Sequence, residues 1–130
     1  MNNLNKNPIK SFRDLEIFQI SYDLMLKIYK EIIPKLPDYE KYDLKSQLRR
    51  SCKAIPRLIA EGYSKRHQKL GFQKYLYDAL AECNETIVSL DQCRDLYNIN
   101  QVLANDIISL YDRTSRQIYK LAIVWRNLKP

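Results

Sequence analysis

The sequence predicts an all-α protein, an elongated antiparallel four-helix bundle of up-down-up-down topology. Only 2 Gly and 5 Pro occur in 130 residues, whereas a β-sandwich or barrel needs a turn about every 8 to 12 residues. Apolar residues recur at alternating spacings of three and four along most of the chain, as on the buried face of packed helices. The stretches between these patterns are short, which favours antiparallel neighbours.

The first predicted helix follows an N-terminal arm. We expect residues 1–11, rich in Asn and Lys, to be flexible, and residues 12–130 to form a single domain. Ser11 and Asp14 are spaced as in a capping box. The helix should then run to about Ile33, because two prolines follow and proline cannot continue a helix. Its apolar seam consists of Leu15, Phe18, Tyr22, Met25, Tyr29 and Ile32.

The second helix is predicted to begin between Tyr39 and Asp43 and to end at Gly62. Glycine is the usual residue in a left-handed C-terminal cap, and we assign that role to Gly62. Pro56 lies inside this helix. Because proline removes one backbone hydrogen bond, the second helix is expected to be kinked at Pro56.

The third and fourth helices are the longest. Apolar residues at near-heptad steps run from Phe72 to Tyr97, and a second series follows Asn100, a plausible N-cap, and reaches Leu128. Each helix would have about 27 residues and a length of about 40 Å. The predicted bundle is therefore elongated.

Positive charge is concentrated in one segment. The chain has 22 Lys and Arg against 15 Asp and Glu, a net charge of +7. Residues 41–70 contain nine basic and two acidic residues, so they account for the whole excess. On a helical projection most of these bases lie opposite the apolar side chains. The candidate nucleic-acid-binding residues are Lys45, Arg49, Arg50, Lys53, Arg57, Lys65, Arg66 and Lys69.

This basic face has two interpretations. It can bind the phosphates of RNA or DNA with little sequence information, and Tyr63, His67 and Tyr75 near the following turn could then stack on unpaired bases. Alternatively, it is a solvated face whose charges are balanced by acidic residues of the third helix. Those residues are Asp78, Glu82, Glu85, Asp91 and Asp95.

Enzymatic, metal and cofactor sites are not expected. The chain has a single His, which excludes a di-iron site of the ferritin type, and it has neither a Cys-x-x-Cys pair nor a glycine-rich phosphate loop. The acidic residues of the third helix are interpreted as a solvated face rather than an acid–base cluster. Cys52, Cys83 and Cys93 are expected to be reduced core residues. We therefore predict a non-enzymatic protein.

The expected compartment is the cytoplasm. The longest run without a charged residue, 96–105, has ten residues, whereas a membrane-spanning helix needs about 20. The N-terminal stretch has neither the apolar run nor the cleavage site of a secretory signal. We expect no membrane association.

Two segments resemble a known family. Residues 42–64, and the opening residues 12–18, look like the signature of the four-helix-bundle proteins encoded in intervening sequences of bacterial 23S ribosomal RNA genes. The likeness extends more loosely over residues 11–128. Where the family usually has a small residue and Asn, this chain has Arg57 and Leu58. The positions that match the family pattern are Arg49, Arg50, Pro56, Glu61 and Gly62.

The resemblance implies a ring-like homopentamer. It also implies kinship with the accessory proteins of diversity-generating retroelements, basic pentamers that bind nucleic acid and a reverse transcriptase. The ten Tyr of the chain independently favour self-association, because tyrosine is enriched at contacts, although they could simply line the rim of the bundle. As a hypothesis, Glu61 pairs with Arg49 or Arg50 of another subunit.

The predicted function is therefore that of an oligomeric, non-enzymatic accessory or scaffold protein that binds nucleic acid, RNA in particular, through the basic face of the second helix. The alternative is a structural or protein-interaction bundle with an unknown partner and no nucleic-acid binding.

Overall fold

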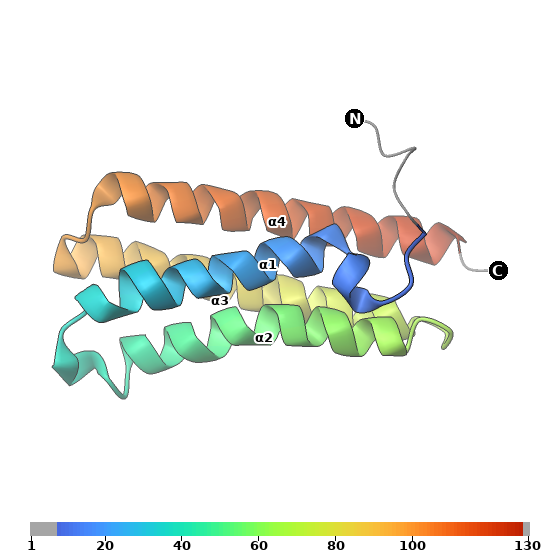
Figure 1. Cartoon of the computed structure of the whole chain (residues 1–130), viewed down its shortest axis with the longest axis horizontal. Helices are drawn as coiled ribbons and strands as arrows, with labels where there is room; N and C mark the ends of the chain where they lie inside the picture. The colour runs from blue at the N-terminus through green and yellow to red at the C-terminus, as the bar shows by residue number, and fades with distance from the viewer. Residues whose placement is uncertain (1–7, 129–130) are drawn as a thin grey trace.

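A computed structural model describes residues 8–128 of the chain, and within them it contains helices and no strands. The four long helices are α1 (Glu16–Lys27), α2 (Leu44–Ser64), α3 (Gly71–Tyr97) and α4 (Gln101–Leu128). They lie lengthwise beside one another, and successive helices are joined at alternating ends of the molecule (Figure 1). Helix α2 packs on α3, α3 packs on α4, and α1 contacts α2 and α4. The all-helical prediction is confirmed.

The predicted capping box is present, but it caps a short turn. The Ser11 hydroxyl accepts a hydrogen bond from the backbone N–H of Arg13, and the Asp14 carboxylate accepts one from the N–H of Ser11. These bonds begin a 3-10 turn, η2 (Phe12–Asp14), and α1 starts two residues later. Residues 8–10 precede the turn without helical structure, and residues 1–7 of the predicted arm lie outside the described residues.

Beyond α1 the chain remains helical but changes its hydrogen bonding. A π-helical turn, η3 (Ile28–Ile32), is followed by two 3-10 turns, η4 (Ile33–Lys35) and η5 (Asp38–Glu40). The N–H of Ile33 bonds to the carbonyl of Ile28, five residues earlier. Pro34 has no N–H with which to continue an α-helix. The regular α-helix therefore ends at Lys27, six residues before the expected Ile33, and only the π-helical and 3-10 turns continue the helical path to Lys35.

The end of α2 differs from the prediction. Gly62 lies inside the helix, which continues to Ser64, and no described glycine has a positive φ. A Cβ atom at Gly62 would lie only 2.5 Å from the Cβ of Tyr75 on α3. The glycine therefore permits the close approach of two helices rather than a left-handed cap. Left-handed backbone occurs instead at Leu70 and Asn98, on either side of α3.

The core follows the apolar pattern of the second helix more closely than that of the first, where the predicted seam residue Tyr22 is 44% exposed and Ile17, Leu24 and Ile28 are buried. Leu48, Ile55 and Ile59 of α2 are completely buried, as are Cys52, Cys83 and Cys93. Burial raises the pKa of each of these three thiols to about 12, so they are protonated, unbridged core side chains as predicted. Helix α2 runs through the buried Pro56 as one element, and the kink expected there stays a prediction.

The two longest helices begin and end close to the predicted residues. Helix α3 has 27 residues and α4 has 28, which corresponds to about 40 Å each. The Asn100 side chain accepts a hydrogen bond from the N–H of Leu103 at 3.1 Å, so it is the N-cap of α4 as expected. Across residues 8–128, no helix is both long enough and apolar enough to span a membrane.

Candidate functional site

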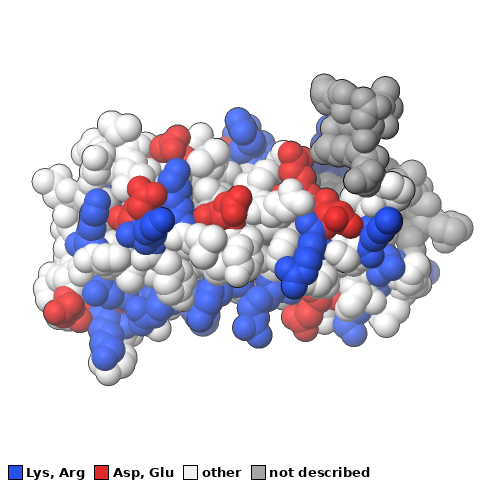
Figure 2. Space-filling view, viewed as in Figure 1, with Lys and Arg blue, Asp and Glu red and all other residues white. Residues whose placement is uncertain are grey.

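Four of the five basic residues of α2, all but Lys45, line an open hollow on its outer side. Because α2 turns its apolar side chains into the core, its basic side chains point away from it, and Lys and Arg gather along the α2 edge of the molecule (Figure 2). The hollow has a volume of about 390 Å³. We call it the basic cleft, and its lining residues are Ser46, Arg49, Arg50, Lys53, Ala54 and Arg57.

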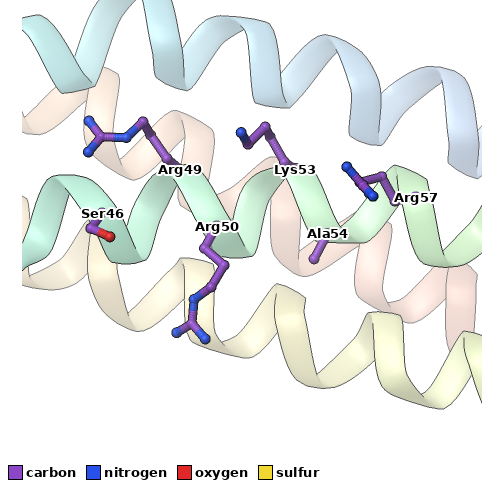
Figure 3. Close-up of a pocket in the computed structure, with 6 residues that line it drawn as sticks. All are labelled: Ser46, Arg49, Arg50, Lys53, Ala54 and Arg57. Carbon is purple, nitrogen blue, oxygen red and sulfur yellow. The ribbon is translucent and has the colours of Figure 1, made fainter.

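The bases of the cleft form two sides. Arg49, Lys53 and Arg57 form a row on the side of α2 that faces α1, whereas Arg50 extends from the opposite side towards α3 (Figure 3). Successive members of the row are four residues apart, a rise of about 6 Å along the helix. Like charges at this spacing repel each other, and no acidic residue lines the cleft. An anion bound there would relieve the repulsion.

Some of the basic residues have partners within the chain. Arg50 pairs with Glu85 of α3 at 3.1 Å, and Lys45 lies 3.6 Å from Asp38. Arg49 donates a hydrogen bond through Nη2 to the carbonyl oxygen of Lys41. Because exposed ion pairs contribute at most about 1 kcal/mol, these contacts can be exchanged for a stronger anionic partner. The balance of basic charge by acidic residues of α3, one of the two interpretations, is thus observed for Arg50, which pairs with Glu85.

Lys53 and Arg57 differ from their neighbours. Both side chains are exposed. In the part of the chain that the structure describes, neither has a side-chain hydrogen bond or an ion pair. Among the bases that line the basic cleft, these two are the most available to an external anion.

The remaining predicted bases lie beyond α2 and do not line the basic cleft. Lys65 is half-buried at the C-terminal cap of α2, and Lys69 is exposed. Arg66 donates a hydrogen bond to the carbonyl oxygen of Tyr63 at 3.0 Å, and its guanidinium lies 4.1 Å from the centre of the Tyr63 ring. The structure therefore divides the predicted basic surface into a helical part and a turn.

Of the three residues proposed for base stacking, one is buried, one is half-buried and one is exposed. Tyr63 is 8% exposed and packs edge-on against Phe72, so the prediction that its ring can stack on bases is wrong. Tyr75 is half-buried with its Cβ against Gly62, and His67 is exposed in the turn. The sequence places Tyr63 near the turn, but only packing shows that its ring points into the core.

Acidic residues of α2 and α3 lie near this surface. Glu61 is exposed, and its pairing with another subunit stays a prediction. Burial raises the pKa of Glu82, and the neighbouring Glu85 and Asp78 add to the effect, while Arg50 opposes it. Among residues 8–128 there is no group of His, Cys, Asp or Glu that could bind a metal ion.

A second hollow adjoins the basic cleft and was not found from the sequence. It has a volume of about 410 Å³ and lies between α2 and the stretch formed by η2 and α1. Lys53 and Arg57 line both hollows. We call it the aromatic groove, and its other lining residues are Phe12, Arg13, Phe18, Tyr22, Met25, Pro56 and Ala60. In the sequence, the apolar seam of the first helix indicates a surface that packs against a neighbour. The seam does not indicate which basic residues of another helix lie beside it.

Comparisons with known proteins are consistent with this architecture. A crystal structure of a protein of unknown function from the S23 ribosomal protein family of Bacteroides thetaiotaomicron VPI-5482 is similar, with a TM-score of 0.70 and 19% sequence identity. The match covers 82% of this chain and 97% of that one, and it shows a shared fold. A search among curated proteins found no match. The family model for the 23S rRNA-intervening sequence protein matches residues 13–120. The chain therefore belongs to the family of 23S rRNA-intervening sequence proteins.

Proposed function

We propose that this protein is a non-enzymatic accessory or scaffold protein of the cytoplasm that binds RNA through the basic cleft of α2. The observation that carries the proposal is the row of Arg49, Lys53 and Arg57, in which the last two are exposed without a partner among the described residues. Such a row neutralises phosphates with little sequence preference.

The proposed assembly is a homo-oligomer of antiparallel up-down-up-down bundles. Exposed apolar and aromatic side chains support self-association, with Leu96, Val102 and Tyr42 between 66% and 86% exposed. The family resemblance implies that this oligomer has five subunits and that a reverse transcriptase is one of its partners. In such a ring every subunit would present its own basic cleft.

The test is a fluorescence anisotropy titration of labelled single-stranded and double-stranded RNA at several salt concentrations. Contacts to about four phosphates should give a slope of about −3 for log affinity against log salt. The double variant R49E/K53E should abolish binding. A matched control, R113E/K120E, makes the same change in charge at exposed residues of α4 and should bind RNA nearly as the wild type does.

The competing function is a protein-interaction bundle without nucleic-acid binding, and the Arg50–Glu85 pair favours it, because this charge is already balanced within the chain. Absence of salt-dependent RNA binding at protein concentrations up to about 10⁻⁴ M, the weak limit for non-specific binding, would favour that alternative. Equal losses in the two double variants would show that net charge, rather than the basic cleft, causes binding.

A further inference from the structure

We propose that the aromatic groove is a base-stacking site, so that the protein binds single-stranded RNA in preference to duplex RNA. This inference rests on the proposed function and adds the class of RNA that the surface takes. The two hollows share Lys53 and Arg57 as a common wall. A strand whose phosphates contact that wall would have its bases beside the groove.

The aromatic rings of the groove form a continuous surface. The ring centres of Phe12 and Phe18 are 4.9 Å apart in an edge-on arrangement, and those of Phe18 and Tyr22 are 5.8 Å apart. Tyr22 is 44% exposed, so its ring is accessible from solvent. Proteins that bind unpaired strands combine such rings with a basic track, because every base has a face that stacks on an aromatic ring.

The charge of the groove favours an anionic occupant. Lys53 and Arg57 line one side and Arg13 lies near Phe12, with its guanidinium 5.0 Å from the ring centre. None of the residues that line the groove is acidic. If a partner protein covered the groove with a purely apolar surface, the ammonium group of Lys53 and the guanidinium group of Arg57 would have no counter-charges. A nucleotide, in contrast, supplies both an apolar face and a phosphate.

The shape of the site explains the preference for an unpaired strand. The bases of a duplex stack on one another, so their faces are not available to a protein ring, and duplex RNA is recognised mainly through phosphates and 2′-hydroxyls. The volume of about 410 Å³ lies within the range of about 300 to 1,000 Å³ that small-molecule sites occupy. Duplex RNA can therefore use the basic cleft but not the aromatic groove.

The experiment compares Tyr22→Ala with Tyr119→Ala in the full chain. Tyr119 of α4 is 53% exposed and does not line the aromatic groove, so it is the matched control. Loss of one stacked base should weaken binding of a labelled single-stranded RNA at least about five-fold. The slope against salt and the affinity for duplex RNA should not change, because no charge is removed. The Tyr119→Ala variant should bind both RNAs as the wild type does.

A second variant tests stacking directly. The Tyr22→Trp substitution, made together with Trp125→Phe, places a single indole in the aromatic groove. Its fluorescence should be quenched by single-stranded RNA and not by the duplex. Unchanged binding by Tyr22→Ala, together with loss of binding by R49E/K53E, would overturn the stacking site while leaving the proposed function in place. Absence of RNA binding by the wild type would overturn both. A changed subunit number in Tyr22→Ala would show that the groove is a subunit contact, which would also overturn the inference.

Discussion

Glu40 joins the start of α2 to the end of α3 through one carboxylate. It is 9% exposed, and its Oε1 accepts a hydrogen bond from the N–H of Leu44 at 3.0 Å, while Oε2 accepts one from the hydroxyl of Tyr97. These two hydrogen bonds lower the pKa of Glu40 below its ordinary value of 4.5, with Tyr97 as the larger cause. The sequence does not indicate this pairing, because 57 residues separate the two side chains.

We predict that Glu40 stabilises the fold only when it is ionised. Because its pKa is lower in the folded protein, its contribution is present above the unfolded pKa and is lost as the pH falls through the folded pKa. The Glu40→Gln variant should therefore be less stable than the wild type at neutral pH, and the difference should shrink below about pH 4.5. Urea denaturation of both proteins across this range measures it. A difference that does not depend on pH would contradict the assignment, and Tyr97→Phe should move the titration of Glu40 towards its ordinary pKa.

At the scale of the helices, the pair formed by α2 and α3 depends on one small residue. A side chain at Gly62 would meet Cβ of Tyr75 at 2.5 Å and Cδ1 of Phe72 at 3.0 Å. The Tyr75 Cβ is fixed to the backbone of α3, so the helices would have to separate. In the same interface the hydroxyls of Ser51 and Thr86 are hydrogen-bonded to each other at 2.8 Å.

The Gly62→Ala substitution should destabilise the protein by about 1 to 3 kcal/mol. Alanine favours a helix over glycine by about 1 kcal/mol, so a net loss of stability would show that overpacking exceeds the gain in helix propensity. Urea denaturation measures the difference. The control is Ala81→Gly at an exposed position of α3, which reports the propensity term alone. A more stable Gly62→Ala variant would show that α2 and α3 can separate without cost.

At the scale of the whole molecule, the fold is shared at low sequence identity. The similar crystal structure has 19% identity and a TM-score of 0.70. Packed cores tolerate extensive substitution when volume and apolar patterning are kept, which explains how so few identical residues are compatible with one fold. The basic cleft lies on an exposed surface, and the core pattern does not dictate its residues.

The assembly is tested by its mass. A homopentamer should give a native mass of about five times the 15.5 kDa of one chain, measured by sedimentation or native mass spectrometry. The result should not change with added salt if apolar and aromatic contacts join the subunits, because salt screens only charge interactions. A monomer at all concentrations would remove the pentamer from the proposal and would leave the single basic cleft as the RNA-binding unit.

The sequence by itself determined the helical class, the ends of α3 and α4, the Asn100 cap, the buried cysteines and the segment that carries the excess charge. These features depend on local periodicity, capping chemistry and composition, which neighbouring residues along the chain specify. Tertiary structure alone decided that Gly62 is a packing glycine, that Tyr63 is buried, that Arg50 meets Glu85, and that the rings of the first helix lie beside Lys53 and Arg57. Each of these depends on the distance between residues on different helices, and helix packing, rather than sequence spacing, sets that distance.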